Sequence, residues 1–185
     1  MNVISRAKVL LTAAVTGSFL FLTGCFADGA LSGTEKSAPG LDGMYSAECE
    51  ITCTENEEEF VYGGKMTRMG GGSWQLELET PDTVKGLKIT VGDDGMNASL
   101  GELSFRLETE KIPNRAAFLT VFGVLDSAAN GGLRFTETET EFCYKGTYGE
   151  ENYTLKYEKA GNTLCGLECG SVSAVFTGFS ETSAP

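Results

Sequence analysis

The chain has 185 residues, of which 26 are Asp or Glu and 14 are Lys or Arg, and its net charge at pH 7 is −12. Such a charge repels nucleic-acid phosphates, which excludes nucleic-acid binding as a function. The chain contains no histidine, so it lacks the usual general base near neutral pH and the commonest metal ligand. We therefore expect no catalytic residue, no metal site and no cofactor.

Residues 1–24 predict a secretory signal peptide. Arg6 and Lys8 precede an apolar stretch that ends at Gly24, which is the pattern of an export signal. The stretch is interrupted by polar residues and is shorter than the about 20 apolar residues that a membrane-spanning helix needs. A permanent transmembrane helix is therefore the weaker interpretation.

The signal peptide ends in the tetrapeptide Leu22, Thr23, Gly24 and Cys25. It resembles the lipobox of bacterial lipoproteins, in which a diacylglyceryl group is attached to the cysteine before cleavage in front of it. The resemblance implies a chain that is lipid-anchored through Cys25 to the cell membrane, outside the cytoplasm. The alternative is an ordinary signal peptide followed by a free cysteine. Two acyl chains suffice for stable anchoring, so the acidic body need not contact the membrane.

Composition divides the mature chain into three parts. Residues 25–43 hold mainly small and polar residues, which predicts a flexible tether after the lipidated cysteine. Residues 44–180 are long enough for one domain with a hydrophobic core. Residues 181–185 are expected to form a short tail.

Apolar and polar residues alternate through most of the domain, which is typical of antiparallel strands with one buried face. The clearest runs are residues 47–54, 74–79, 87–91, 103–108 and 153–158. Turn sequences separate the runs at residues 55–58, 70–72, 93–95 and 160–162. We predict about ten short strands.

Residues 113–131 interrupt this alternation and predict one main helix. Apolar residues recur there at helical spacing, at Phe118, Val121, Phe122, Leu125 and Ala129. Asn114 is expected to cap the start, and the glycines after Asn130 are expected to end the helix. Gly123 costs about 1 kcal/mol relative to alanine, so the helix should depend on tertiary packing.

The expected sheet is much wider than the expected helix. Ten strands about 4.8 Å apart span roughly 43 Å, whereas a helix with its side chains is only about 10–12 Å across. The sheet must therefore curl around the helix as a half-barrel, leaving an apolar groove, or close on itself as a barrel or sandwich. We predict the first arrangement, an α+β fold that is mainly antiparallel β.

Several short sequence segments and the order of the predicted elements resemble the outer-membrane lipoprotein-carrier (LolA-like) superfamily. They are residues 74–78, Pro81, residues 85–89, the helix, residues 153–157 and residues 175–179. The resemblance implies a half-barrel whose apolar concave face holds acyl chains or lipopeptides. Lipid-anchored relatives include sporulation and germination lipoproteins of clostridia. This chain differs from the soluble carrier because it has its own anchor and no helix is expected before its first strand.

The residues expected to line the concave face are aromatic or large and apolar. They are Phe60, Tyr62, Trp74, Leu76, Phe105, Phe118, Phe122, Phe142, Tyr144 and Phe176. For each of them taken alone, packing in a solid core is the alternative interpretation. Only the excess of apolar sheet surface over helix surface predicts a cavity.

The cysteines that remain after lipidation are Cys49, Cys53, Cys143, Cys165 and Cys169. Cys49 and Cys53 should lie about 13 Å apart on one strand, too far for a disulfide. Cys165 and Cys169 are similarly spaced unless a glycine bends the chain. Cross-strand disulfides and reduced buried thiols both stay open, and the spacing is not typical of a thiolate metal site.

These observations predict a membrane-anchored bacterial lipoprotein with a non-catalytic binding or carrier-like domain that holds a lipid or lipopeptide acyl chain. The alternative is an interaction or scaffold lipoprotein of the cell envelope, for example in sporulation or germination, with a solid interior and a protein partner. An open or filled concave face distinguishes the two.

Overall fold

The computed structural model describes residues 35–108 and 116–181, and these fall in one compact unit of the chain. The predicted signal peptide, the lipobox residues Leu22, Thr23 and Gly24, and Cys25 lie outside the described residues. Within the described residues, no helix is long and apolar enough to cross a membrane. The elements are β1 (Glu35–Lys36), β2 (Tyr45–Glu55), β3 (Glu58–Gly70), β4 (Ser73–Thr80), η1 (Asp82–Val84), β5 (Lys88–Gly92), β6 (Gly95–Leu100), β7 (Leu103–Leu107), α1 (Ala117–Ala129), β8 (Leu133–Glu137), β9 (Glu141–Tyr148), β10 (Glu151–Glu158), β11 (Thr163–Cys169) and β12 (Val172–Glu181).

All described strands belong to one antiparallel sheet of 12 strands, in the order β1-β8-β9-β10-β11-β12-β2-β3-β4-β5-β6-β7. Its outer strands, β1 and β7, do not pair with each other. The sheet is therefore open, and the prediction of a half-barrel rather than a closed barrel is confirmed. The number of strands exceeds the predicted ten, partly because β1 has only two residues and carries no alternating pattern.

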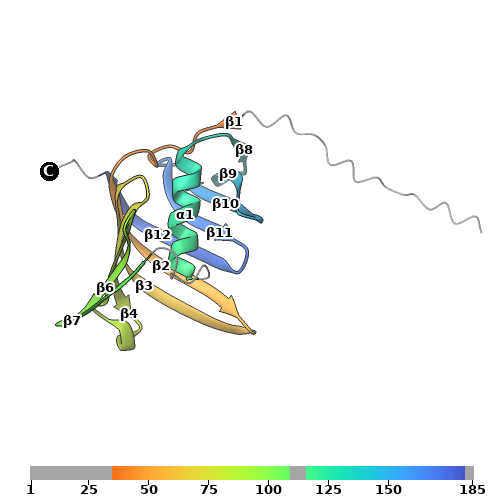
Figure 1. The fold of residues 1–185 in the computed structure, drawn as a ribbon. Coiled ribbons are helices and arrows are strands. Elements are labelled where there is room, and N and C mark those ends of the chain that lie inside the picture. The colour runs from red at the N-terminus through yellow and green to blue at the C-terminus, as the bar shows by residue number, and fades with distance from the viewer. Residues whose placement is uncertain (1–34, 109–115, 182–185) are drawn as a thin grey trace, which may run out of the picture. The chain divides into compact units, whose positions relative to one another are not determined.

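Helix α1 lies on the concave face of the curled sheet, with β8–β11 to one side of it, β4, β6 and β7 to the other, and β12 and β2 passing behind it (Figure 1). Its main contacts are with β2, β9, β11 and β12. The residues that it buries are Ala117, Val121, Phe122, Val124, Leu125 and Ala128. The predicted cap, Asn114, lies outside the described residues; the helix begins at Ala117, and its N-cap, Ala116, makes no side-chain capping bond. Gly131, at φ +82°, ends the helix as predicted.

The glycine in the middle of the helix has a packing role. The ring of Tyr148 lies against Gly123, so closely that a Cβ atom at this position would overlap the ring and its hydroxyl. The lower helix propensity of glycine is thus offset by close contact between α1 and the end of β9.

The predicted tether is too long at its C-terminal end. Leu41 is fully buried and Ala38 is 6% exposed, so both belong to the hydrophobic core. The Pro39 carbonyl accepts a hydrogen bond from the Tyr157 hydroxyl at 3.0 Å. Residues 35–43 are mainly small and polar, so their composition does not indicate that Leu41 packs into the core. The domain therefore begins before residue 44.

The five cysteines of the described residues are free thiols. Cys49 lies opposite Phe176, and Cys53 opposite Val172, where β2 pairs with β12. No cysteine therefore faces another across this pair of strands. Burial raises the pKa of the Cys49 thiol to about 12, which keeps it protonated and inert as a nucleophile.

The buried hydroxyl of Tyr45 has no hydrogen-bond partner among the described residues. Its ring is fully buried, stacked 4.5 Å from Phe179 and edge-on to Trp74.

Tyr45→Phe should therefore raise the free energy of unfolding by about 1 kcal/mol, because an unsatisfied buried polar group is removed. Tyr157→Phe is the matched control and should cost about 1 kcal/mol, since its bond to Pro39 is lost. Urea unfolding measures both. An equal loss in the two variants would show that Tyr45 has a partner.

Candidate functional site, an apolar groove beside the helix

An apolar groove of about 370 Å³ lies between the first turn of α1 and the concave face of strands β2–β5. Its lining consists almost wholly of apolar side chains. They are Ile51, Cys53, Glu55, Phe60, Tyr62, Leu76, Leu78, Val84, Leu87, Ile89, Ala116, Ala117 and Phe118. We refer to this site as the groove.

The alternation of the strands forms the groove floor. Ile51 pairs with Tyr62 on β3, and Leu76 on β4 pairs with Ile89 on β5. Paired residues project from the same face of a sheet, so these four side chains make one apolar surface. Val84, in the short helix η1, adds a wall from the segment between β4 and β5.

The helix borders the groove only with its first turn, because the rest of α1 is held against the sheet. Phe122 stacks on Trp74 of β4, with ring centroids 4.7 Å apart and nearly parallel planes. Val121, Val124 and Leu125 are fully buried. The groove is thus the part of the concave face that the helix does not cover.

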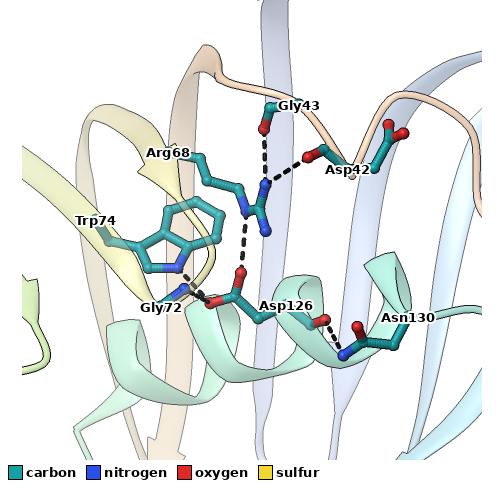
Figure 2. Close-up of polar contacts among 7 residues, drawn as sticks. All are labelled: Asp42, Gly43, Arg68, Gly72, Trp74, Asp126 and Asn130. Atoms are coloured by element: carbon teal, nitrogen blue, oxygen red, sulfur yellow. Dashed lines mark hydrogen bonds and ion pairs between the residues drawn. The ribbon is translucent and has the colours of Figure 1, made fainter.

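A polar cluster anchors the helix to the sheet, as Figure 2 shows. Arg68 of β3 donates from Nε to Oδ1 of Asp126 at 2.9 Å, and the Trp74 indole donates to Oδ2 at 2.6 Å. The backbone amide of Gly72 donates to Oδ2 as well, at 3.3 Å. One helix carboxylate therefore holds β3, β4 and the turn between them.

The same arginine holds the segment before β2. Its Nη1 donates to the carbonyl oxygens of Asp42 and Gly43, at 3.1 and 2.7 Å (Figure 2). Arg68 is only 5% exposed, and a buried charge requires such partners. The cluster is structural, and its effect on the groove is to fix the position of α1.

Four of the ten residues expected to line the concavity do line the groove: Phe60, Tyr62, Leu76 and Phe118. Trp74 and Phe122 lie in the core beneath the helix. On the other half of the sheet, Tyr144 packs edge-on against Tyr157, and Phe142 packs against Phe135. Phe176 of β12 is buried.

Phe105 lies on the same face as the groove floor but outside the groove. It pairs with Ala98, which pairs with Ile89, so the row of paired residues runs from the groove to β7. Ile89 and Ala98 are buried, whereas Phe105 is 55% exposed. The reason is that β7 is the outer strand of the sheet, beyond the strands that α1 chiefly contacts.

Sequence reasoning missed the aliphatic lining residues Leu78, Val84, Leu87 and Ala117. The expected set favoured aromatic side chains, although strand alternation places Leu78 on the same face as Leu76. Val84 had no periodic signal, because it lies in the connection between two strands.

Among the described residues, no group of three or more Cys, Asp or Glu side chains is placed to hold a metal ion. Burial, followed by the nearby charge of Glu55, raises the pKa of the Cys53 thiol, which disfavours the reactive thiolate. The surface can bind an apolar ligand by exclusion of water, and its few polar groups lie among many apolar ones.

A second cavity, of about 570 Å³, lies between Thr120 of α1 and the ends of β2, β9, β10, β11 and β12, and it shares Cys53 and Glu55 with the groove. Its lining mixes polar and apolar residues, including Thr120 of the helix and Tyr148, Glu151 and Ser171. A polar lining of this kind does not favour an acyl chain.

No protein-family model matches the chain, and a search of curated proteins finds no significant match. Similar solved structures include a LolA superfamily protein from Nitrosomonas europaea, with 9% identity and a TM-score of 0.38 over 80% of this chain and 95% of that one. A domain of an outer membrane lipoprotein-sorting protein from Vibrio parahaemolyticus matches with 9% identity and a TM-score of 0.36, over 80% and 88% of the two chains. A chain from the complex of the CwlD amidase with the GerS lipoprotein of Clostridioides difficile matches with 15% identity and a TM-score of 0.41, over 68% and 75%.

Proposed function

We propose that this protein is an exported lipoprotein, anchored through acyl chains on Cys25, whose domain holds the acyl chain of a lipid in the groove without catalysing a reaction. The observation that carries the proposal is the open apolar groove between α1 and strands β2–β5. A groove of about 370 Å³ lies within the range of small-molecule binding sites, roughly 300–1,000 Å³.

The chemistry of the lining selects the class of ligand. Each methylene group that leaves water contributes about 0.8 kcal/mol, so several methylenes in the groove supply the affinity of a specific site. The groove offers few hydrogen-bonding side chains, of which Tyr62 and Glu55 are two. A polar ligand would lose its bonds to water there, whereas an acyl chain has none to lose.

Native mass spectrometry tests the proposal with the chain from residue 25 onward, carrying Cys25→Ser so that it stays unacylated. This form keeps the compact unit that contains every described element. We expect the purified protein to carry, or to take up, one single-chain lipid. A protein that stays empty with fatty acids, alkyl glycosides and alkylamines at high concentration would refute acyl-chain binding.

The alternative function, a scaffold lipoprotein with a solid interior, is less well supported because the described residues leave an apolar groove on the concave face. It would be favoured if cross-linking in the native cell captured one dominant protein while no lipid co-purified with the chain.

A further inference from the structure

The β2–β3 hairpin carries a pair of facing carboxylates at the end of the groove. Glu55, the last residue of β2, lines the groove, and it pairs directly with Glu58, the first residue of β3. Asn56 and Glu57 connect them with φ angles of +51° and +69°, the conformation of a tight two-residue hairpin turn. The turn therefore fixes two glutamates directly opposite each other.

Both carboxylates project from the groove face of the hairpin. Side chains alternate along a strand, so Glu55 shares the face of Ile51 and Cys53, and Glu58 shares the face of Phe60. All three of these apolar residues line the groove. Glu59, one residue further along, projects from the opposite face.

In the part of the chain that the structure describes, no lysine or arginine forms an ion pair with Glu55 or Glu58. Like charges directly opposite each other in a sheet destabilise it, and both glutamates are exposed. Among the described residues, the lysines and arginines in ion pairs have other partners: Asp126, Glu77, Asp94, Glu168 and Glu137.

Two weaker positive features of the described residues lie near the groove. Lys85 follows Val84 and is exposed, and the uncapped start of α1 contributes about half a positive charge. The start of α1 lies at the opposite wall of the groove from the sheet. Among the described residues, Glu55 and Glu58 thus place two full negative charges at the hairpin end, where the head group of a bound chain would meet water.

We infer that the lipid held in the groove has a positively charged head group, such as a primary or quaternary ammonium, next to its acyl chain. The inference rests on the proposed function. Glu55 and Glu58 would attract an ammonium group and repel a carboxylate or phosphate at the same place. They are specificity-determining residues, whereas the apolar lining supplies most of the affinity.

The test compares three single-chain amphiphiles of equal chain length: an alkylammonium, an uncharged alkyl glycoside and a fatty carboxylate. Isothermal titration calorimetry below the micelle concentration measures each Kd for the unacylated chain. We expect the alkylammonium to bind about tenfold more tightly than the carboxylate at low salt, with the glycoside between them. Salt should reduce the difference, because exposed charges are screened.

The double variant Glu55→Gln with Glu58→Gln should bring the three affinities to within about twofold. The control, Glu57→Gln with Glu59→Gln, removes the same charge from the same hairpin and should keep the original order. Equal affinities for all three amphiphiles in the unchanged chain, or an order that both variants keep, would overturn the inference alone. Absence of binding by any amphiphile would refute the proposed function instead. Tighter binding of an apolar basic peptide would assign the groove to a protein ligand and overturn both.

Discussion

Asp126→Ala should lower the free energy of unfolding by about 3 kcal/mol, the largest effect that we expect from a single polar substitution. Removal of one partner from a buried ion pair leaves an uncompensated buried charge, which costs about 3–5 kcal/mol. The lower end applies because the Asp126 side chain is 24% exposed, while that of Arg68 is 6% exposed. The Trp74 indole and the Gly72 amide would lose their acceptor as well. Urea unfolding followed by tryptophan fluorescence measures the loss.

Two controls separate the ion pair from a general effect of charge. Glu77→Ala removes the partner of Lys88 in an exposed pair and should cost less than about 1 kcal/mol. Asp126→Asn keeps an acceptor for Trp74 and should cost less than Asp126→Ala. In a double-mutant cycle with Arg68→Met, the two losses should not add. A loss for Asp126→Ala no larger than that for Glu77→Ala would contradict an anchoring role for the cluster.

The strands and the helix could be predicted from the sequence because each depends on local periodicity. Alternation through residues 74–79 and 153–158 predicted β4 and β10, and the spacing of Phe118, Val121 and Leu125 predicted α1. Comparison of sheet width with helix width then predicted that the sheet curls and stays open. These steps require no knowledge of which distant residues meet.

The anchoring cluster and the extent of the domain could not be predicted in this way. Arg68 and Asp126 are separated by 58 positions, and neither has a local pattern that indicates burial. Leu41 is a single apolar side chain in a polar segment, and only the three-dimensional gap that it fills explains its burial. Charged or isolated residues enter a core through specific partners, and specific partners are not visible in periodicity.

The sequence predicted more apolar sheet surface than one helix can cover. The position of the resulting groove depends on where the helix is held against the sheet. The anchoring residues Asp126, Leu125 and Phe122 lie in the middle and the C-terminal half of α1. The helix therefore covers the part of the sheet beneath these residues and leaves the sheet uncovered beside its first turn. Phe105 shows the same limit of sequence reasoning. Alternation places it on the same sheet face as the groove floor, but does not indicate that it lies on an outer strand away from the helix.

Ala117→Trp should weaken acyl-chain binding more than a hundredfold if the groove is the lipid site. Ala117 is 8% exposed and lines the groove from the first turn of α1, so an indole at this position would occupy the space of the ligand. Displacement of about four methylenes at about 0.8 kcal/mol each costs about 3 kcal/mol of binding free energy. Calorimetric titration with the alkylammonium amphiphile measures the Kd of the variant and of the unchanged chain.

Thr120→Trp places the same side chain one turn further along α1, in the second cavity, which has a more polar lining and touches the groove only at Cys53 and Glu55, and it should leave acyl-chain binding within about threefold. Thermal unfolding of both variants checks that neither loses the fold. If Thr120→Trp abolished binding and Ala117→Trp did not, the acyl chain would lie in the second cavity and not in the groove. Equal binding by both variants and the unchanged chain would place the lipid outside either cavity. A selective loss in Ala117→Trp is expected because the first turn of α1 is the wall that the ligand must contact.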